Sequence, residues 1–237
     1  MVVVLRGLKG VDPPPQRSGV WILWVISHPE LVTEAEARAY DMVFVASQTW
    51  TLPGGVPSTP LLQATAPDRF SPDAAPPDSG AALLFVGSTR GQFRPAVRGA
   101  LASDRADELS VYGVGWEEFI DVGRISADFL DNDHLPAAYA GAGIVLNDHH
   151  PEMAADGFLS NRLFDAVATG ARVVSDSAAG LEEVFGDTVV VFTDEDHLVD
   201  ILHAPVDDTF PSRDRRMEAA TTIAVEHSFD ARSGVLI

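Results

Sequence analysis

The stretch at positions 157–176 constrains the fold of this chain more than any other part of the sequence. It reads GFLSNRLFDAVATG and then ARVVSD, a helical pattern followed at once by an apolar run rich in β-branched residues. Leu163, Phe164 and Val167 have the spacing of one buried helical stripe. Gly170 stands where a left-handed helix end belongs. The sequence therefore predicts a helix packed on a buried parallel strand.

The polar residues at the start of this predicted helix suggest a ligand. Ser160 is a candidate N-cap, whose hydroxyl can accept a bond from an amide of the first turn. Asn161 and Arg162 lie in that turn, where unpaired amides and the helix dipole favour an anion. Asp165 lies one turn further along. A nucleotide diphosphate would satisfy both groups, with phosphate at the helix start and ribose beyond it. An ordinary Arg162–Asp165 surface ion pair explains the same residues equally well.

Apolar β-branched runs alternate with helical patterns along the chain, which predicts an α/β fold with parallel sheets. Apolar residues make up 46% of the sequence, enough for buried cores. We expect strands over 2–5, 20–26, 42–47, 60–63, 82–86, 109–112, 125–130, 143–146, 173–175 and 189–192. We expect helices over 34–40, 95–102, 135–140, 161–169, 180–185, 197–202 and 213–227.

A proline-rich segment at 71–80 is interpreted as a linker between two domains. Residues 1–70 contain too few strands and helices for a complete doubly wound domain, so we interpret them as a partial N-terminal α/β domain. Residues 81–210 have the elements of a Rossmann-like domain. Residues 211–237 are expected to form a C-terminal helix that can cross back to the first domain. An incomplete first sheet would expose an edge that another subunit can cover, so a homo-oligomer is among the expected partners.

Charge and composition exclude several classes of function. The formal net charge is −19, which argues against a nucleic-acid binder. The absence of cysteine excludes disulfide frameworks and thiolate metal sites. No apolar run reaches the roughly 18 residues of a membrane span, and the N-terminus lacks the pattern of a signal peptide. We therefore expect a cytoplasmic protein in which a bound polyanion meets a local group of arginines.

The loops that follow the strands are the candidate sites, because ligands of parallel sheets bind at the carboxyl ends of the strands. The loop after the strand at 82–86 contains Gly87, Ser88, Thr89, Arg90 and, close behind, Arg94. Small residues let backbone amides approach an anion, and the two arginines can grip a phosphate. The loop lacks the glycine spacing of a dinucleotide fingerprint and the lysine of a P-loop. A plain strand-to-helix turn is the alternative.

The turn at 112–116 places glycines beside aromatic side chains. Tyr112, Gly113 and Trp116 can hold a nucleobase by stacking. Trp116 can instead be a core residue over which the chain turns, and for this side chain we favour the core interpretation.

The loop at 147–153 reads NDHHPEM and has two candidate uses. Its histidines and carboxylates suggest a metal site, but adjacent histidines rarely face one ion and no further group of ligands accompanies them. We expect no metal here. The candidates for binding the hydroxyls of a sugar are Asn147, Asp148, His149, Gly157 and Ser160.

His28 ends a buried strand of the first domain and is the candidate catalytic residue. A histidine at that edge can act as general base on an acceptor hydroxyl. The alternative is a histidine that caps the next helix or bonds a backbone carbonyl.

Taken together, these stretches resemble the donor-binding domain of group 1 GT-B glycosyltransferases, and most of all the branch named after the spore maturation protein CgeB. The segment at 157–170 is the most specific part of the resemblance. The matching stretches lie at 84–87, 111–116, 144–149, 157–170, 180–186 and 227–229, with 24–29 and 40–47 upstream.

The resemblance implies an enzyme that moves a sugar from a nucleotide-diphosphate-sugar donor to a cell-envelope glycan, lipid or protein, without a metal or any other cofactor. It implies that Arg162 and Asn161, with the loop at 87–90, hold the diphosphate, which the helix dipole and the arginine stabilise as it departs. Asp165 occupies the place of a glutamate that bonds the ribose in related enzymes. Gly157 occupies the place of a glutamate of retaining relatives, so no stereochemistry is assigned.

The resemblance also implies a first, acceptor-side domain that begins upstream of the strand at 2–5, so we expect this domain to be shortened. Three hypotheses follow. The protein is a glycosyltransferase, a nucleotide-sugar-binding module with little activity, or a nucleotide-sugar epimerase or hydrolase on the same fold. Sugar transfer, binding without turnover, and conversion of the donor without an acceptor distinguish the three.

Overall fold

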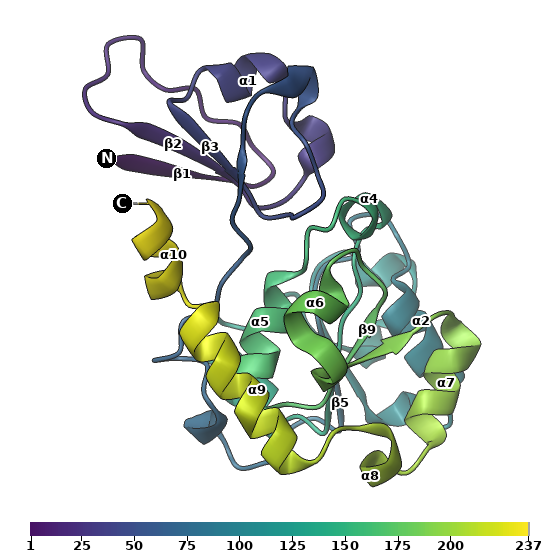
Figure 1. Ribbon diagram of the computed structural model, residues 1–237. Coiled ribbons are helices and arrows are strands. Elements are labelled where there is room, and N and C mark those ends of the chain that lie inside the picture. Colours follow the sequence, from purple (N-terminus) through teal and green to yellow (C-terminus); the bar gives the residue numbers. More distant parts are fainter. Residues whose placement is uncertain (237) are drawn as a thin grey trace. The chain divides into compact units, whose positions relative to one another are not determined.

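The computed structural model describes residues 1–236 as two compact units, each built on its own parallel β-sheet (Figure 1). Unit 1 contains Met1–Gln63, His149–Leu159 and Ala178–Val184. Unit 2 contains Ala64–Asp148, Ser160–Ser177 and the residues from Phe185 onwards. The predicted α/β fold with parallel sheets is confirmed. No helix in the described part of the chain is long and apolar enough to cross a membrane.

Four parallel strands form the sheet of unit 1 in the order β1-β2-β3-β4. They span Val2–Arg6, Trp21–Val25, Met42–Val45 and Thr59–Pro60. The helices of this unit are α1 (Glu34–Arg38), α4 (Pro151–Ala155) and most of α6 (Leu181–Phe185), with 3₁₀ turns over Pro29–Leu31 and Pro53–Gly55. The Thr33 hydroxyl accepts a 3.1 Å bond from the Glu36 amide and so caps the start of α1.

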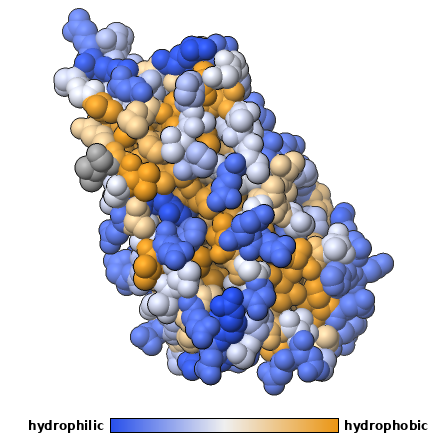
Figure 2. All heavy atoms as spheres, in the orientation of Figure 1, coloured by the Kyte–Doolittle hydropathy of each residue, from blue (hydrophilic) through white to orange (hydrophobic). Residues whose placement is uncertain are grey.

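The core of unit 1 includes a side chain from a distant part of the sequence. Phe158 is fully buried beside Leu23, Val25 and Val43, and its ring stands edge-on to Trp50 with the centroids 5.5 Å apart. Other apolar side chains of this unit remain exposed, namely Met1, Val2, Leu5, Leu8, Val11, Val20, Leu31 and Met42. Figure 2 shows apolar residues at the surface near the N-terminal strands.

Six parallel strands form the sheet of unit 2 in the order β7-β6-β5-β8-β9-β10. In chain order they span Leu83–Val86 (β5), Leu109–Tyr112 (β6), Ile125–Ala127 (β7), Ile144–Leu146 (β8), Val173–Asp176 (β9) and Val189–Phe192 (β10). The chain runs outward from β5 to β7 and then returns to place β8 on the other side of β5. The direction of strand order therefore reverses between β5 and β8, and such a switch point is where doubly wound sheets bind ligands.

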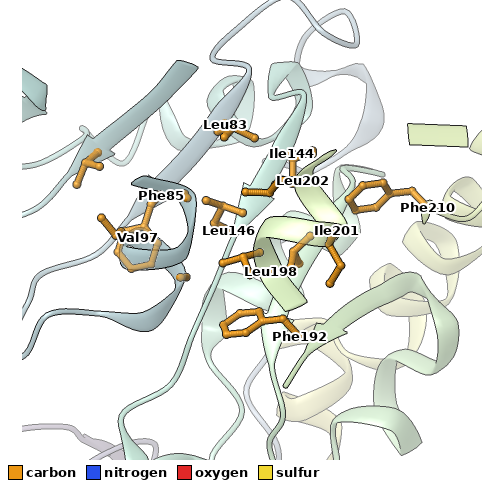
Figure 3. Close-up of a cluster of buried hydrophobic side chains, with 14 of the residues drawn as sticks. Leu83, Phe85, Val97, Ile144, Leu146, Phe192, Leu198, Ile201, Leu202 and Phe210 are labelled. Carbon is orange, nitrogen blue, oxygen red and sulfur yellow. The ribbon is translucent and has the colours of Figure 1, made fainter. Parts of the chain in front are cut away.

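Helices cover this sheet in two groups. One group is α2 (Pro95–Ala102) and α7 (Glu195–His203), and the other is α3 (Leu135–Gly141), α5 (Asn161–Ala168) and α9 (Arg213–Glu226). The short helices α8 (Val206–Thr209) and α10 (Phe229–Leu236) complete the unit. Because side chains alternate along a strand, Leu83 and Phe85 of β5 both enter the core that α2 and α7 cover (Figure 3).

Most of the predicted elements lie within a few residues of their predicted positions. The strand predicted over 60–63 is the two-residue β4, and the helix predicted over 197–202 begins at Glu195 because Asp194 caps it. The sequence did not predict α4 or α8, which are short and lack a long apolar stripe, and the helix expected within 211–237 is divided at His227 into α9 and α10. The proline-rich segment at 71–80 packs along unit 2, where the Gly80 amide donates a 2.8 Å bond to the Gly141 carbonyl.

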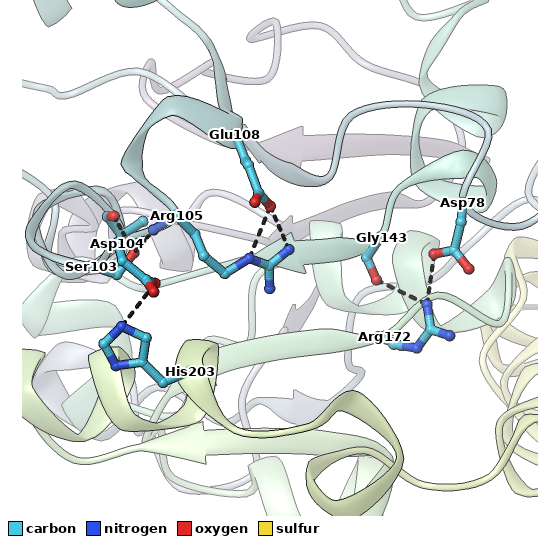
Figure 4. A network of polar contacts seen from close by, with 9 residues as sticks. Asp78, Ser103, Asp104, Arg105, Glu108, Gly143, Arg172 and His203 are labelled. Carbon is cyan, nitrogen blue, oxygen red and sulfur yellow. Dashed lines mark hydrogen bonds and ion pairs between the residues drawn. The ribbon is translucent and has the colours of Figure 1, made fainter.

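At the amino ends of the unit 2 strands, basic side chains are paired with carboxylates (Figure 4). Arg105 bonds Glu108 at 2.7 Å, just before β6, and Arg172 bonds Asp78 at 2.8 Å, just before β9. Each of these guanidinium groups therefore has its own acidic partner.

Candidate functional site

Three segments of unit 2 meet where the switch point predicts a ligand: the loop after β5, the loop after β8, and the first turn of α5. Arg162 lies in that first turn, and its Nη1 donates a 2.6 Å bond to Oδ1 of Asn147. The carbon atom of its guanidinium lies 5.1 Å from the centroid of the Phe85 ring. The Arg162 side chain is also hydrogen-bonded to the Tyr139 side chain. The sequence-predicted residues Arg162, Asn147 and Gly87 are thus brought together.

Gly87 leaves the space that the Arg162 guanidinium occupies. A Cβ atom at position 87 would lie 2.5 Å from Nη2 of Arg162, so a side chain here would displace the cation. Burial lowers the pKa of Arg162 from its ordinary value, although an arginine stays protonated in proteins. No carboxylate in residues 1–236 forms an ion pair with Arg162. The charge of Asp148 raises the pKa of Arg162, but Asp148 forms its ion pair with Arg94, so the partly exposed guanidinium of Arg162 has no carboxylate in direct contact among the described residues.

The start of α5 differs in one detail from its prediction. Ser160 occupies the N-cap position, but its side chain makes no capping hydrogen bond to the first turn. The prediction that the Ser160 hydroxyl caps α5 is therefore wrong. The predicted left-handed end of the helix is confirmed, because Gly170 has a φ of 71°.

Asp165 is buried, and both of its carboxylate oxygens are hydrogen-bonded. Oδ1 accepts a 2.8 Å bond from the Thr65 hydroxyl, and Oδ2 accepts a 2.7 Å bond from the Asn161 side-chain amide. Burial raises the pKa of Asp165 to about 7, and the two donated bonds only partly oppose this effect. The Arg162–Asp165 surface ion pair, which was the alternative interpretation, is not formed.

The loop after β5 is held close to the loop after β6. The Gly87 amide donates to the Tyr112 carbonyl at 2.8 Å, and Thr89 donates to Val114 at 3.2 Å. Gly113, with a φ of 144°, permits this approach, because a Cβ there would lie 2.2 Å from the Gly87 carbonyl oxygen.

Arg90 lies at the tip of the loop after β5 and is exposed. It has a φ of 50°, and Gly91 follows with a φ of 76°, so two left-handed residues form a tight turn. A non-glycine residue in this conformation costs about 1–3 kcal/mol and is often found at binding sites.

Arg94 and Asp148 form a buried pair, and we correct both assignments. Their side chains are 5% and 0% exposed and form an ion pair. Arg94 also donates a 2.8 Å bond to the Asp148 carbonyl, while Oδ2 of Asp148 accepts a 2.9 Å bond from the Ala96 amide. These contacts fasten the start of α2 to the loop after β8. We therefore reassign Arg94 from diphosphate binding, and Asp148 from sugar binding, to this structural role.

Asn147 is reassigned because its side chain does not reach the surface, and the favoured core interpretation of Trp116 is confirmed. Asn147 is 0% exposed and its amide nitrogen donates a 2.8 Å bond to the Ser175 hydroxyl. Trp116 is 0% exposed, lies edge-on to Phe85, and donates from Nε1 to the Gly87 carbonyl at 2.9 Å. A ring without an exposed face cannot stack on a nucleobase. Tyr112 is half-buried and stays a candidate for base binding.

Three predicted residues belong to unit 1. His28 has the left-handed values φ 55° and ψ 53°, and its Nδ1 lies 3.0 Å from the Ser27 hydroxyl. His149 is buried. Gly157 is buried with a φ of 70°, and a Cβ there would lie 2.8 Å from the Thr49 hydroxyl. Residues 1–236 hold no group of three or more histidine, aspartate or glutamate side chains placed to bind a metal.

Sequence reasoning did not find the residues that support the site. Thr65, Phe85, Tyr139 and Ser175 hold Asp165, Arg162 and Asn147, but each lies in a segment that reads as ordinary core or loop. No spacing in the sequence connects Thr65 to a helix that begins almost 100 residues later.

Structures of known glycosyltransferases resemble this fold. Anabaena HepE in complex with UDP-glucose has a TM-score of 0.67 at 13% identity, covering 92% of this chain and 71% of that one. AviGT4, a glycosyltransferase involved in avilamycin A biosynthesis, has a TM-score of 0.62 at 17% identity, covering 99% and 72%. Sucrose-phosphate synthase from Thermosynechococcus elongatus has a TM-score of 0.62 at 16% identity, covering 93% and 67%.

Comparison of the sequence itself identifies the family. None of the curated proteins compared with the chain matches it. A family model described as glycosyl transferase-like matches residues 93–237, which is more than half of the chain and includes the loop after β8 and all of α5. With its two parallel sheets and the arginine at the switch point, the protein belongs to the group 1 glycosyl transferase-like family and has the GT-B fold.

Proposed function

We propose that the protein transfers a sugar from a nucleotide-diphosphate-sugar donor, and that Arg162 holds the diphosphate. The main support is that this guanidinium lies at the switch point and forms no ion pair with a carboxylate of residues 1–236, in a chain whose formal net charge is −19. A partly buried charge without a partner is costly unless a ligand compensates it. Ser88 and Arg90 of the loop after β5 and the backbone amides of the first turn of α5 complete the proposed diphosphate site, whereas the Gly87 and Thr89 amides are bonded to Tyr112 and Val114.

The remaining roles follow from the positions of the side chains. Asp165 is proposed to bond the ribose, with a ribose hydroxyl replacing the bond that Asn161 donates to Oδ2. Tyr112 is the proposed contact for the base, and His28 the proposed base for an acceptor hydroxyl. The acceptor is a glycan, lipid or protein of the cell envelope, and the reaction needs no metal, because the helix start and Arg162 stabilise the departing diphosphate.

A binding experiment tests this proposal directly. HepE is described in complex with UDP-glucose, so UDP and its sugars come first in a panel that also contains ADP, GDP and dTDP with their sugars. Thermal shift selects the ligand and calorimetry measures its affinity. Arg162→Ala should weaken binding by about 1.5–3 kcal/mol, the scale of one charged hydrogen bond.

Arg124→Ala is the matched control, because Arg124 is exposed and pairs with Asp107 at 3.0 Å in another part of unit 2. Its affinity should equal that of the unmodified protein. An unchanged affinity in Arg162→Ala would contradict the proposed diphosphate site.

Binding without turnover is the second candidate function. It is favoured by one observation, namely that both oxygens of Asp165 are already hydrogen-bonded by groups of the protein itself. Incubation of the donor with and without candidate acceptors separates the cases. Recovery of intact donor under saturating binding supports a binding module, whereas release of the nucleoside diphosphate supports an enzyme.

A further inference from the structure

The groups that hold the guanidinium of Arg162 are all uncharged. Nη1 bonds the amide oxygen of Asn147 at 2.6 Å, the Phe85 ring lies beneath the guanidinium, and the hydroxyl of Tyr139 completes the set. Burial raises the pKa of Tyr139 to about 12, so this hydroxyl stays neutral at physiological pH. The cation is therefore fixed in place without being neutralised.

The acidic residues near Arg162 are engaged by other partners. Asp148 raises the pKa of Arg162 through its charge but forms its ion pair with Arg94, and Asp165 accepts bonds from Thr65 and Asn161. This arrangement differs from the amino edge of the same sheet, where Arg105 and Arg172 each bond a carboxylate (Figure 4). Arg162 therefore differs from Arg94, Arg105 and Arg172 in that its guanidinium is bonded to an amide oxygen rather than to a carboxylate.

Both the oxygen and the nitrogen of the Asn147 side-chain amide are hydrogen-bonded. The amide oxygen accepts from Arg162, and the amide nitrogen donates a 2.8 Å bond to the hydroxyl of Ser175 on the neighbouring strand β9. Because the residue is 0% exposed, it does not contact a bound donor directly. The two bonds set the rotamer of Asn147, and through it the position of the guanidinium.

We propose that Asn147 is a positioning residue whose neutral amide oxygen fixes Arg162 and leaves the positive charge of this arginine for the diphosphate of the donor. This inference rests on the proposed function, since it assigns Arg162 to the diphosphate. A carboxylate at position 147 would hold the guanidinium equally well but would neutralise it. The geometry and the charge of the site can therefore be changed separately.

Two variants separate these contributions. Asn147→Ala removes the support and keeps the charge, so UDP affinity measured by calorimetry should fall about tenfold, the equivalent of about 1.4 kcal/mol. Asn147→Asp keeps the support and pairs the charge, so UDP affinity should fall as far as in Arg162→Ala. Asn132→Asp is the matched control, because Asn132 is exposed and the same substitution there adds the same negative charge. It should bind UDP as the unmodified protein does.

A measurement without ligand tests the support itself. In ¹⁵N spectra of arginine side chains, the Nη resonances of Arg162 should be resolved in the unmodified protein and in Asn147→Asp, where rotation of the guanidinium is restricted. They should average in Asn147→Ala. Averaging in the unmodified protein would overturn the inference whatever the ligand is.

The affinities also separate the two proposals. If Arg162→Ala binds UDP normally, the proposed function fails, while the spectra still decide whether Asn147 fixes the arginine. If Arg162→Ala loses affinity but Asn147→Asp does not, the charge argument is overturned and the proposed function stands. A double variant, Arg162→Ala with Asn147→Ala, should bind no more weakly than Arg162→Ala alone, because Asn147 acts through Arg162.

Discussion

Thr65 donates a 2.8 Å hydrogen bond to Oδ1 of Asp165, which lies 100 residues later in the chain. The backbone of Thr65 is paired as well: its amide donates to the His227 carbonyl at 2.9 Å, and its carbonyl accepts from the Phe229 amide at 3.0 Å. The carboxylate of α5 is therefore joined through one buried threonine to the junction between α9 and α10. Asp165, which is proposed to bind the ribose, thus also helps to hold α5 against the C-terminal helices of unit 2.

Removing the Thr65 hydroxyl should destabilise the protein. Thr65→Val preserves the shape of the side chain but leaves Oδ1 of the buried Asp165 without this donor, which should lower the free energy of unfolding by about 1–3 kcal/mol. Thr65→Ser keeps a hydroxyl and should lose less. Chemical denaturation of the three proteins checks this order, and equal losses in the valine and serine variants would show that the hydrogen bond is not the cause.

Asp165 should make the stability depend on pH in an unusual direction. Its pKa is raised to about 7 from an ordinary value of 3.8, so between these pH values the folded protein binds more protons here than the unfolded chain. The contribution of this group to stability is therefore present below about pH 4 and is lost as the pH rises through about 7. The largest slope from one such group is about 1.4 kcal/mol per pH unit.

Asp165→Asn removes this titration and provides the comparison. The free energy of unfolding should fall more steeply with rising pH in the unmodified protein than in the variant, between about pH 4 and 7. His227 acts in the opposite direction, because burial lowers its pKa to about 4, but it is present in both proteins and cancels in the difference. Parallel stability curves for the two proteins would contradict a raised pKa at Asp165.

Gly87→Ala should weaken the binding of a nucleoside diphosphate. The new Cβ would lie 2.5 Å from Nη2 of Arg162, and the flexible arginine would move away rather than the backbone. We expect about a tenfold loss of affinity, or about 1.4 kcal/mol, in calorimetry. Gly234→Ala is the control, because no atom lies within 4 Å of a Cβ at that position. Equal affinity in the two variants would show that Gly87 does not set the position of Arg162.

Arg94→Ala should act on stability. It leaves the fully buried carboxylate of Asp148 without its cation, and breaking such a pair typically costs about 3–5 kcal/mol. Arg98→Ala, one turn later in α2, removes only a partly exposed pair with Glu195 and should cost less than about 1 kcal/mol. Thermal and chemical denaturation compare the two. A stable Arg94→Ala protein with reduced nucleotide affinity would restore the original assignment of Arg94 to the diphosphate.

Local patterns account for the parts of the fold that were predicted from the sequence. The apolar runs at β5, β8 and β9 are continuous because parallel strands are buried on both faces, and the end of α5 at Gly170 follows from a local conformational requirement. The helices α4 and α8 were missed because helices of four or five residues without a long apolar stripe carry little periodic signal.

The candidate site was predicted only in part. Placing Arg162 beside the loop at Gly87 required only the rule that ligands bind at strand ends, and the structure does bring these residues together. The rule does not state which polar side chains of those loops face inward. Asn147, Asp148 and Arg94 are on the correct loops, but their side chains are bonded inside the protein. Asn147 bonds Arg162 and Ser175, and Arg94 bonds Asp148.

The amino-acid sequence by itself determined the α/β class, the parallel strands and the helix that carries Arg162, because each depends on the periodicity of neighbouring residues. Only the tertiary structure decided which charges are paired. Ion pairs and buried hydrogen bonds join residues far apart in the chain, as Thr65 joins Asp165 and Arg94 joins Asp148, and their formation depends on distance and burial rather than on spacing. That Arg162 forms no ion pair with a carboxylate of residues 1–236 could therefore be recognised only after the chain was folded.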